Sequence, residues 1–292
     1  MSYWLAGMSA FDAICHAFSV CAAGGFSTRT LSIGAFDSTL ISLITIVFMF
    51  LASIHFGLIF VTLVGRTLRP LRNPVLRFYV GSLAIISLIT SLSLKFQGVD
   101  ATWGGAFLDG TFHVVSYAST TGFAISDNAN WPMLPCFLLM IVSLVCGCAG
   151  STTGGMKVDR VMVLIRAIHM QIQKTLYPSS VFEVRVGRRV LHDEEIYPQI
   201  LYLAIFALLI GLSTILCLLV GDPNGHALTG SVSTLANVGP SLGTIGSMGN
   251  YGAEPPALKL IFSANMFLGR VEIFPIFAVF SSIFNRKYQG RA

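Results

Sequence analysis

Three short stretches place glycine and small polar residues inside otherwise apolar sequence: "CAAGGFSTR" from Cys21, "STTGFAISD" from Ser119 and "ANVGPSLGT" from Ala236. Glycine allows backbone dihedrals that turn successive carbonyl oxygens toward one axis, and a ring of such oxygens can replace the hydration shell of a cation. The pattern predicts a cation filter, with loop glycines that only allow close helix packing as the alternative. Aligned on the shared glycine, the filter positions are Ala23, Gly24 and Gly25; Thr120, Thr121 and Gly122; and Asn237, Val238 and Gly239.

The first two stretches belong to a longer internal repeat, and repeats in membrane proteins usually surround one site. Each also carries an aspartate and a histidine at matching positions, which the third stretch lacks. We expect the aspartates to cap the starts of short helices, with attraction of cations to an outer mouth as the alternative. We expect the histidines to hydrogen-bond a neighbour rather than to relay protons. The matched pairs are Asp12 and Asp109, His16 and His113, and Phe26 and Phe123.

The composition indicates which elements must position these stretches. The chain of 292 residues is 54% hydrophobic and 11% charged, with a mean hydropathy of +0.76. Because soluble domains carry about 25% charged residues, the chain is expected to be a membrane protein. A membrane-spanning helix needs about 17–25 apolar residues. The candidate spans are Thr39–Val64, Phe78–Leu94, Ile200–Val220 and Ala257–Phe284, with Leu134–Ala149 continued by Met156–Met170.

Each Gly-rich stretch follows a helical segment that is too short to span a bilayer: Phe11–Val20, Phe107–Ala118 and Ala227–Leu235. Non-helical backbone survives at membrane depth only where protein buries it or where it lines water. The sequence therefore predicts an all-α polytopic membrane protein. Its units are helix–pore-helix–helix repeats of the potassium-channel type, placed around a central pore.

Two further features interrupt apolar sequence. "GCAGSTTGGM" (Gly147–Met156) spreads glycine and hydroxyl residues over ten positions, which disfavours a continuous helix. A small-residue contact between helices is the alternative explanation. Arg270 lies within the last apolar run, where a charge needs water or a partner. Glu272 is a candidate partner for Lys157 or for another helix.

Basic residues cluster in three regions: 66–77, 157–189 and 286–291. Loops rich in Lys and Arg face the cytoplasm, so topology explains the net charge of +5 and nucleic acid need not be a partner. Alternation across Val181–Val190 predicts a hairpin that turns at Gly187. This hairpin is a candidate dock for a regulator or a plain linker. The six cysteines lie in or beside apolar segments and are expected to be packing residues.

Five motifs, in order, resemble the Trk/Ktr/HKT superfamily of potassium transporters, and its bacterial TrkH branch in particular. They are "GGFSTRTLSIG", "STTGFAISDNANWP", "GCAGSTTGGMKVDRVMVLIR", "NVGPSLGTIG" and "LGRVEIFPIFAVF". The resemblance implies four repeats around one pore, a homodimer, and a cytoplasmic nucleotide-binding regulatory subunit of the TrkA type. It also implies an intramembrane gate beneath the filter. The gate residues are Gly147, Gly150, Ser151, Thr152, Thr153, Gly154, Gly155 and Arg270.

The family pattern divides this chain into a second repeat (1–70), a third repeat with the gating loop (71–175), a cytoplasmic connector (176–197) and a fourth repeat (198–292). The first repeat and the opening helix of the second have no counterpart here, so we interpret the chain as an incomplete or split subunit whose missing repeat another chain can supply.

The expected function is potassium uptake across the inner membrane, with membrane lipid around the protein. Potassium is the transported ion, and we expect neither an organic cofactor nor an enzyme activity. A sodium-conducting member and a non-conducting scaffold or remnant are the alternatives.

Overall fold

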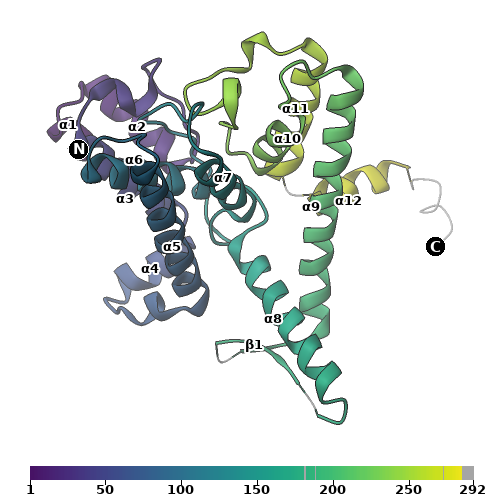
Figure 1. Ribbon diagram of the computed structural model, residues 1–292. Helices are drawn as coiled ribbons and strands as arrows, with labels where there is room; N and C mark the ends of the chain where they lie inside the picture. The colour runs from purple at the N-terminus through teal and green to yellow at the C-terminus, as the bar shows by residue number, and fades with distance from the viewer. Residues whose placement is uncertain (181, 188, 272, 285–292) are drawn as a thin grey trace.

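The computed structural model describes residues 1–180, 182–187, 189–271 and 273–284. The described chain is almost entirely helical, and its helices group into three units around the three short helices α2, α6 and α10 (Figure 1). We call these the α2, α6 and α10 units. The α2 unit contains α1 (Ser2–Leu5), α2 (Ala10–Cys21), the 3-10 turn η1 (Ser32–Phe36), α3 (Thr39–Ala52), α4 (Phe56–Val64) and η2 (Arg69–Arg72).

The α6 unit contains α5 (Pro74–Phe96), α6 (Trp103–Ala118), α7 (Met133–Val145) and α8 (Val158–Leu176). A two-stranded hairpin follows, formed by β1 (Val184–Val186) and β2 (Arg189–Leu191). The α10 unit contains α9 (Asp193–Val220), α10 (Ala227–Ala236), η3 (Gly243–Ile245), η4 (Tyr251–Ala253), α11 (Pro256–Val271) and α12 (Ile273–Phe284).

The three short helices are capped at their starts by polar side chains, but these are not the repeated aspartates. The hydroxyl of Ser9 accepts a hydrogen bond from Asp12 N at 3.1 Å, and that of Thr102 accepts one from Gly105 N at 3.0 Å. Asp222 Oδ2 accepts from Ala227 N at 2.6 Å. The expected capping role of Asp12 and Asp109 is therefore wrong: Asp12 lies in the first turn behind Ser9, and Asp109 lies in the middle of α6.

Among the described residues, α5 and α9 are long and apolar enough to cross a membrane, and α3 with α4 forms a third candidate that is bent by 100°. The single helix expected over Thr39–Val64 is thus two helices. The bend frees backbone groups that a distant loop satisfies. Cys148 N donates to Ser53 O at 3.0 Å, and Phe56 N donates to Gly150 O at 3.1 Å.

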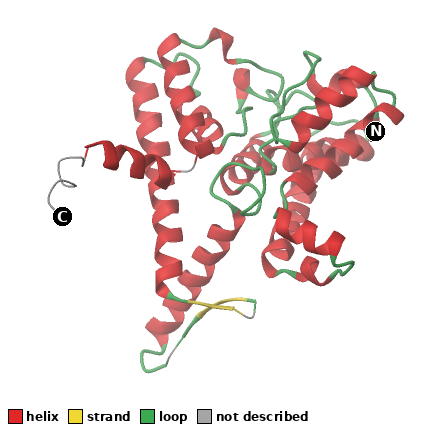
Figure 2. Cartoon of the chain, turned by 180° about the vertical axis from the view of Figure 1, so that it is seen from behind, coloured by secondary structure: helices red, strands yellow, loops and turns green. Residues whose placement is uncertain are grey.

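The last apolar run also differs from the expected single helix over Ala257–Phe284. The described chain places α11 up to Val271 and α12 from Ile273 onward. Figures 1 and 2 both show α12 pointing away from the body of the molecule. Arg270 therefore lies in the last turn of α11 rather than in the middle of a continuous helix.

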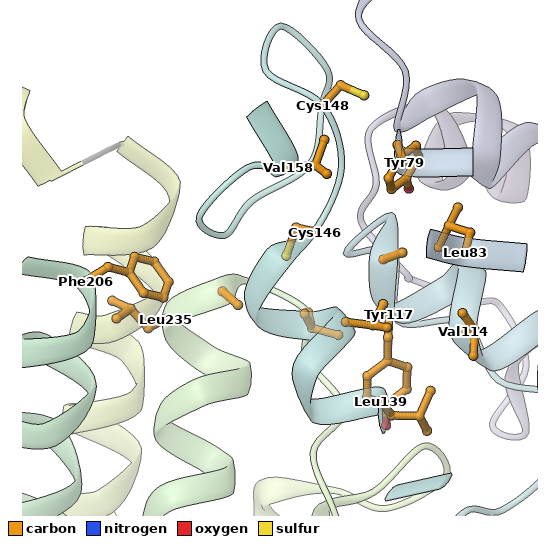
Figure 3. Packing of buried hydrophobic residues seen from close by; sticks show 14 of the residues in the cluster. Tyr79, Leu83, Val114, Tyr117, Leu139, Cys146, Cys148, Val158, Phe206 and Leu235 are labelled. Carbon is orange, nitrogen blue, oxygen red and sulfur yellow. The ribbon is translucent and has the colours of Figure 1, made fainter. Parts of the chain in front are cut away.

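The main apolar core joins the α6 and α10 units. Figure 3 shows buried side chains from α5, α6, α7, α9 and α10 that face one another across this junction. Val114, Leu139, Phe206 and Leu235 have no exposed surface. Because the two units share this core, the ends of α6 and α10, where the predicted filter begins, are held in fixed relative positions. Burial of each such side chain contributes about 1.5–3 kcal/mol.

α8 and α9 run side by side away from the core, and the hairpin lies beside them (Figure 2). The strands pair antiparallel, with Val184 opposite Leu191 and Val186 opposite Arg189. Gly187 adopts a φ of +63°, which allows the tight turn. The predicted hairpin is confirmed over the described residues; Val181, the start of the predicted segment, lies outside them.

Candidate functional site

The three predicted filter segments share one backbone conformation. In each set the first and third residues have positive φ: 51° and 69° at Ala23 and Gly25, and 53° and 75° at Thr120 and Gly122. The third set repeats the pattern, with 59° at Asn237 and 95° at Gly239. In an extended chain whose residues all have negative φ, successive carbonyl groups point to opposite sides. When residues with positive and negative φ alternate, successive carbonyl groups point toward the same side, as coordination of an ion requires.

The same hydrogen bond anchors each segment to the short helix before it. The middle filter residue donates its N–H to the carbonyl of a serine on the last turns of that helix. The pairs are Gly24 N to Ser19 O at 2.8 Å, Thr121 N to Ser116 O at 3.0 Å and Val238 N to Ser233 O at 3.0 Å. We did not single out these serines from the sequence. Their constant position, six residues before the aligned glycine, is the signal that could have found them.

The serine hydroxyls act on the residues just beyond the filter. Ser116 Oγ donates to Phe123 O at 2.7 Å, and Ser233 Oγ lies 2.6 Å from Pro240 O and 3.0 Å from Gly239 O, the last residue of its segment. Ser19 Oγ is buried without a hydrogen-bond partner among the described residues. In two of the three segments, one serine therefore makes two hydrogen bonds. Its carbonyl accepts from the middle residue of the segment, and its hydroxyl donates to a carbonyl at the far end.

The three segments lie side by side in the order of the chain. A Cβ added to Gly25 would lie 1.9 Å from Thr121 O, and one added to Gly122 would lie 2.5 Å from Val238 O. Real Cβ atoms do not approach that closely, so only glycine fits at both positions. A Cβ on Gly239 would meet no described atom within 4 Å. The three segments therefore lie in a row, with Gly25 beside Thr121 and Gly122 beside Val238, and the described residues leave open space where a Cβ of Gly239 would lie.

Above the filter, loops from the three units line a cavity of about 310 Å³. The loops are joined by polar contacts between units. Asn128 Nδ2 donates to Tyr117 Oη at 2.8 Å, while Asn128 Oδ1 accepts from Ser247 N at 2.8 Å. Tyr117 Oη in turn donates to Ser241 O at 3.0 Å. This network holds the outer ends of the α6 and α10 units together.

In the α2 unit, the side chain of Asp12 binds the loop that follows the predicted filter segment. Its carboxylate accepts from Thr28 Oγ1 at 2.5 Å and from Arg29 Nη2 at 3.0 Å. The Thr28 hydroxyl, with further contributions that include Arg29, holds the pKa of Asp12 below its ordinary value. These bonds fix the chain that follows the predicted filter segment to the start of α2.

The two repeated histidines also tie a short helix to the chain beyond the filter. The Nδ1 atom of His16 lies 2.7 Å from Asp12 O, and its Nε2 atom lies 2.8 Å from Ser27 Oγ. In His113 the corresponding distances are 2.9 Å to Asp109 O and 3.2 Å to Ser126 O. Both rings are fully buried. This geometry agrees with the structural hydrogen bonding that we expected.

The predicted interruption is a loop between α7 and α8 that contacts the predicted filter segments. The loop between α7 and α8 donates from Gly154 N to Thr120 Oγ1 at 3.0 Å. A Cβ on Gly154 would lie 2.3 Å from Ala236 O, and one on Gly147 would lie 2.8 Å from Ser53 O. These glycines therefore let the loop pack against all three units, which is the close packing that we kept as the alternative to a gate.

Two positively charged side chains, those of Arg270 and Lys157, contact the same loop. Arg270 Nη1 donates to Thr152 O at 2.9 Å, and its Nη2 lies 3.5 Å from Ala22 O, directly before the filter of the α2 unit. Lys157 Nζ donates to Thr153 O and, at 3.2 Å, to Thr153 Oγ1. Arg270 and Lys157 line one cavity of about 260 Å³ together with the residues of the loop. Glu272, proposed as a partner of Lys157, lies outside the described residues.

The structure thus brings all nine predicted filter residues, the loop residues of the predicted gate and Arg270 into one region. The groups that face one another there are backbone carbonyls, hydroxyls and two cations. Among the described residues no cluster of three His, Cys, Asp or Glu side chains is placed to hold a metal ion. An ion in this region would meet backbone oxygens.

The profile of one protein family, described as "TrkH: Cation transport protein", matches residues 1–288. Among curated proteins, the Trk system potassium uptake proteins TrkH of Salmonella typhimurium strain LT2 and of Escherichia coli strain K12 are each 34% identical over 288 residues, covering 98% of this chain and 59% of the relative. The chain therefore spans about three fifths of these relatives.

Two further relatives extend the comparison. The Trk system potassium uptake protein TrkG of Escherichia coli strain K12 is 31% identical over 289 residues and is covered over 58% of its length. The crystal structure of the potassium transporter TrkH from Vibrio parahaemolyticus matches with a TM-score of 0.91 and 32% identity. This match covers 98% of the present chain and 61% of that one.

Proposed function

The chain belongs to the TrkH family of cation transport proteins, and on that basis we propose that it forms part of a potassium uptake pathway across the inner membrane. The observation that carries this proposal is the backbone of the three filter segments. All three share alternating handedness and the same anchoring hydrogen bond. Stacked carbonyls of this kind can replace the hydration shell of a cation, and the relatives with printed functions are potassium uptake proteins.

We propose further that the chain needs a fourth filter segment to conduct ions. A Cβ added to Gly239 would meet no described atom within 4 Å, and the chain covers 59% of the length of its Salmonella typhimurium relative. Three quarters of a carbonyl ring leaves an ion under-coordinated and exposes polar backbone to lipid. A fourth repeat, from the same or from another polypeptide, would complete the ring.

The loop below the filter is proposed as the gate. Thr152 and Gly154 bring it into contact with both Arg270 and the filter residue Thr120. A guanidinium at this place repels a cation that leaves the filter, and the loop obstructs its path. Movement of the loop would remove both barriers together. The hairpin of β1 and β2 is the proposed dock for a cytoplasmic nucleotide-binding subunit of the TrkA type, and a homodimer is the proposed assembly.

The test is growth on limiting potassium in a strain that lacks its own uptake systems. The chain is expressed alone and joined to the amino-terminal part of E. coli TrkH that it does not cover. We expect growth only with the joined protein, and radioactive rubidium uptake measures the same difference directly. Growth supported only at high sodium, with sodium rather than rubidium uptake, would favour the sodium-conducting alternative. Membrane insertion without uptake of either ion would favour the scaffold.

A further inference from the structure

A long apolar groove lies outside the pore region, at the junction of α3, α5 and α6. It has a volume of about 750 Å³ and is lined almost entirely by apolar side chains, with Phe50 of α3 and Phe107 of α6 on two of its sides. One face of α5 forms the third side. The α5 residues are Val80, Leu83, Ala84, Ser87 and Leu88. Their spacing is that of a single helical face about 12 Å long.

An arginine lies on the same helical face as the α5 side of the groove. Arg77 precedes Val80 by three residues, which places both on one face of α5. Arg77 is exposed, as are Arg66 and Arg72 in the segment that leads into α5. None of these three arginines forms an ion pair with a described carboxylate. The sequence contains no Asp or Glu between Asp37 and Asp100 that could neutralise them.

The helix before these arginines, α4, is short, apolar and exposed. α4 is bent by 100° from α3 and contains no buried residue. It is apolar, with Phe60, Leu63 and Val64 more than 60% exposed. Figure 1 shows it near the lower ends of α3 and α5. Arginines that directly follow an apolar segment are typical of its cytoplasmic end, at the level of the lipid headgroups.

We propose that the groove and these arginines form a binding site for one anionic phospholipid of the cytoplasmic leaflet. One acyl chain lies along the α3–α5–α6 groove, and the headgroup phosphate is bound by Arg77, with Arg66 and Arg72 nearby in sequence. Guanidinium groups bind phosphate through paired hydrogen bonds. The charge of this segment gives the site its preference for anionic over zwitterionic lipid. The proposal does not depend on which ion the protein conducts.

The probe is palmitoyl-oleoyl phosphatidylglycerol, compared with the phosphatidylcholine of the same chains. The purified chain is delipidated in detergent, and bound lipid is counted by native mass spectrometry during titration. We expect one phosphatidylglycerol per chain at concentrations where phosphatidylcholine does not bind. Arg77→Gln should weaken phosphatidylglycerol binding about fivefold, since one arginine near an anionic headgroup contributes about that factor. Lys174→Gln removes an exposed cation of α8 and should change nothing.

A second measurement locates the lipid without relying on a variant. Phosphatidylglycerol with a photoreactive diazirine on its acyl chain should label peptides of α3, α5 and α6 that line the groove. Ala84→Phe, which fills the groove, should abolish this labelling. Equal binding of the two lipids, or labelling spread evenly over α9 and α11, would overturn the proposal. Crosslinks between the α5 helices of two chains would overturn it as well, because a second copy would then cover the groove.

Discussion

The guanidinium of Arg270 donates to the carbonyl oxygen of Thr152 at 2.9 Å, across a separation of 118 residues in the chain. This contact joins the last turn of α11 to the loop between α7 and α8, which we propose as the gate. A loop at membrane depth needs donors for its free carbonyl groups, and arginine offers five in a fixed fork. The same side chain reaches Ala22 O, so it links the loop to the α2 unit as well.

Replacing Arg270 tests the proposed gate. In the protein joined to the amino-terminal part of E. coli TrkH, Arg270→Ala should raise rubidium flux into proteoliposomes at fixed potential, because it removes a cation and a tether together. Deleting residues from Ser151–Gly154 should raise flux in the same way. The two changes together should be less than additive, since both act on one element. Ser263→Ala on α11 serves as the control. Parental flux in both single variants would mean that Arg270 is a structural residue.

The contact between the loop and the filter can be tested separately. Thr120→Val keeps the shape of the side chain and removes the oxygen that accepts from Gly154 N. We expect higher flux and an unfolding free energy lower by about 1 kcal/mol, the usual value for such a hydrogen bond. The matched control is Thr121→Val, whose hydroxyl contacts Ser119 Oγ at 2.8 Å instead of the loop. If both variants raise flux equally, the Gly154 contact does not hold the gate.

Two filter glycines with positive φ differ in their surroundings. Gly122→Ala forces a Cβ to within 2.5 Å of Val238 O, while Gly239→Ala meets no described atom. Both variants carry the strain of a left-handed alanine, about 1–2 kcal/mol. Only Gly122→Ala should also displace a neighbouring filter segment. We therefore expect a lower thermal stability and a lower preference for potassium over sodium in Gly122→Ala than in Gly239→Ala. An unchanged ion preference in both variants would refute the filter assignment.

The repeated serines give a prediction about stability alone. Ser116 Oγ donates to the buried Phe123 O, whereas Ser19 Oγ has no partner among the described residues. Ser116→Ala should therefore lower the free energy of unfolding by about 1–3 kcal/mol, because it leaves a buried carbonyl unpaired. Ser19→Ala should be neutral or slightly stabilising. Chemical denaturation in one detergent compares the two, and equal losses would show that the hydroxyl contact is not the cause.

The sequence predicted the features that local chemistry determines. The three short helices begin and end within a few residues of their expected limits, and Gly25, Gly122 and Gly239 all adopt positive φ. The family was also recognised correctly from five motifs. The helix limits and the glycine conformations each depend on residue types within one short stretch, whereas the family match depends on short motifs spread along the chain.

The features that sequence reasoning missed depend on contacts between distant segments. The bend after Ala52 is stabilised by backbone bonds to Cys148 and Gly150, about a hundred residues away. Within the apolar run Thr39–Val64, the local sign of the bend is His55, whose Nδ1 atom accepts a hydrogen bond from Gly57 N at 2.9 Å. The capping role of Asp109 failed for a different reason. α6 starts earlier than the aligned helix α2, because Thr102 caps it. Matching two repeats by their aspartates assumed that their helices begin at the same place.

The bend between α3 and α4 has a mechanical consequence. The loop beneath the filter is bonded to both sides of this bend, through Ser53 O before it and Phe56 N after it. A displacement of the loop must either break these bonds or carry the start of α4 along. We propose that α4 and the loop move together. A partner that shifts the exposed helix α4 would then shift the loop, and with it the contact of Gly154 N with Thr120 Oγ1.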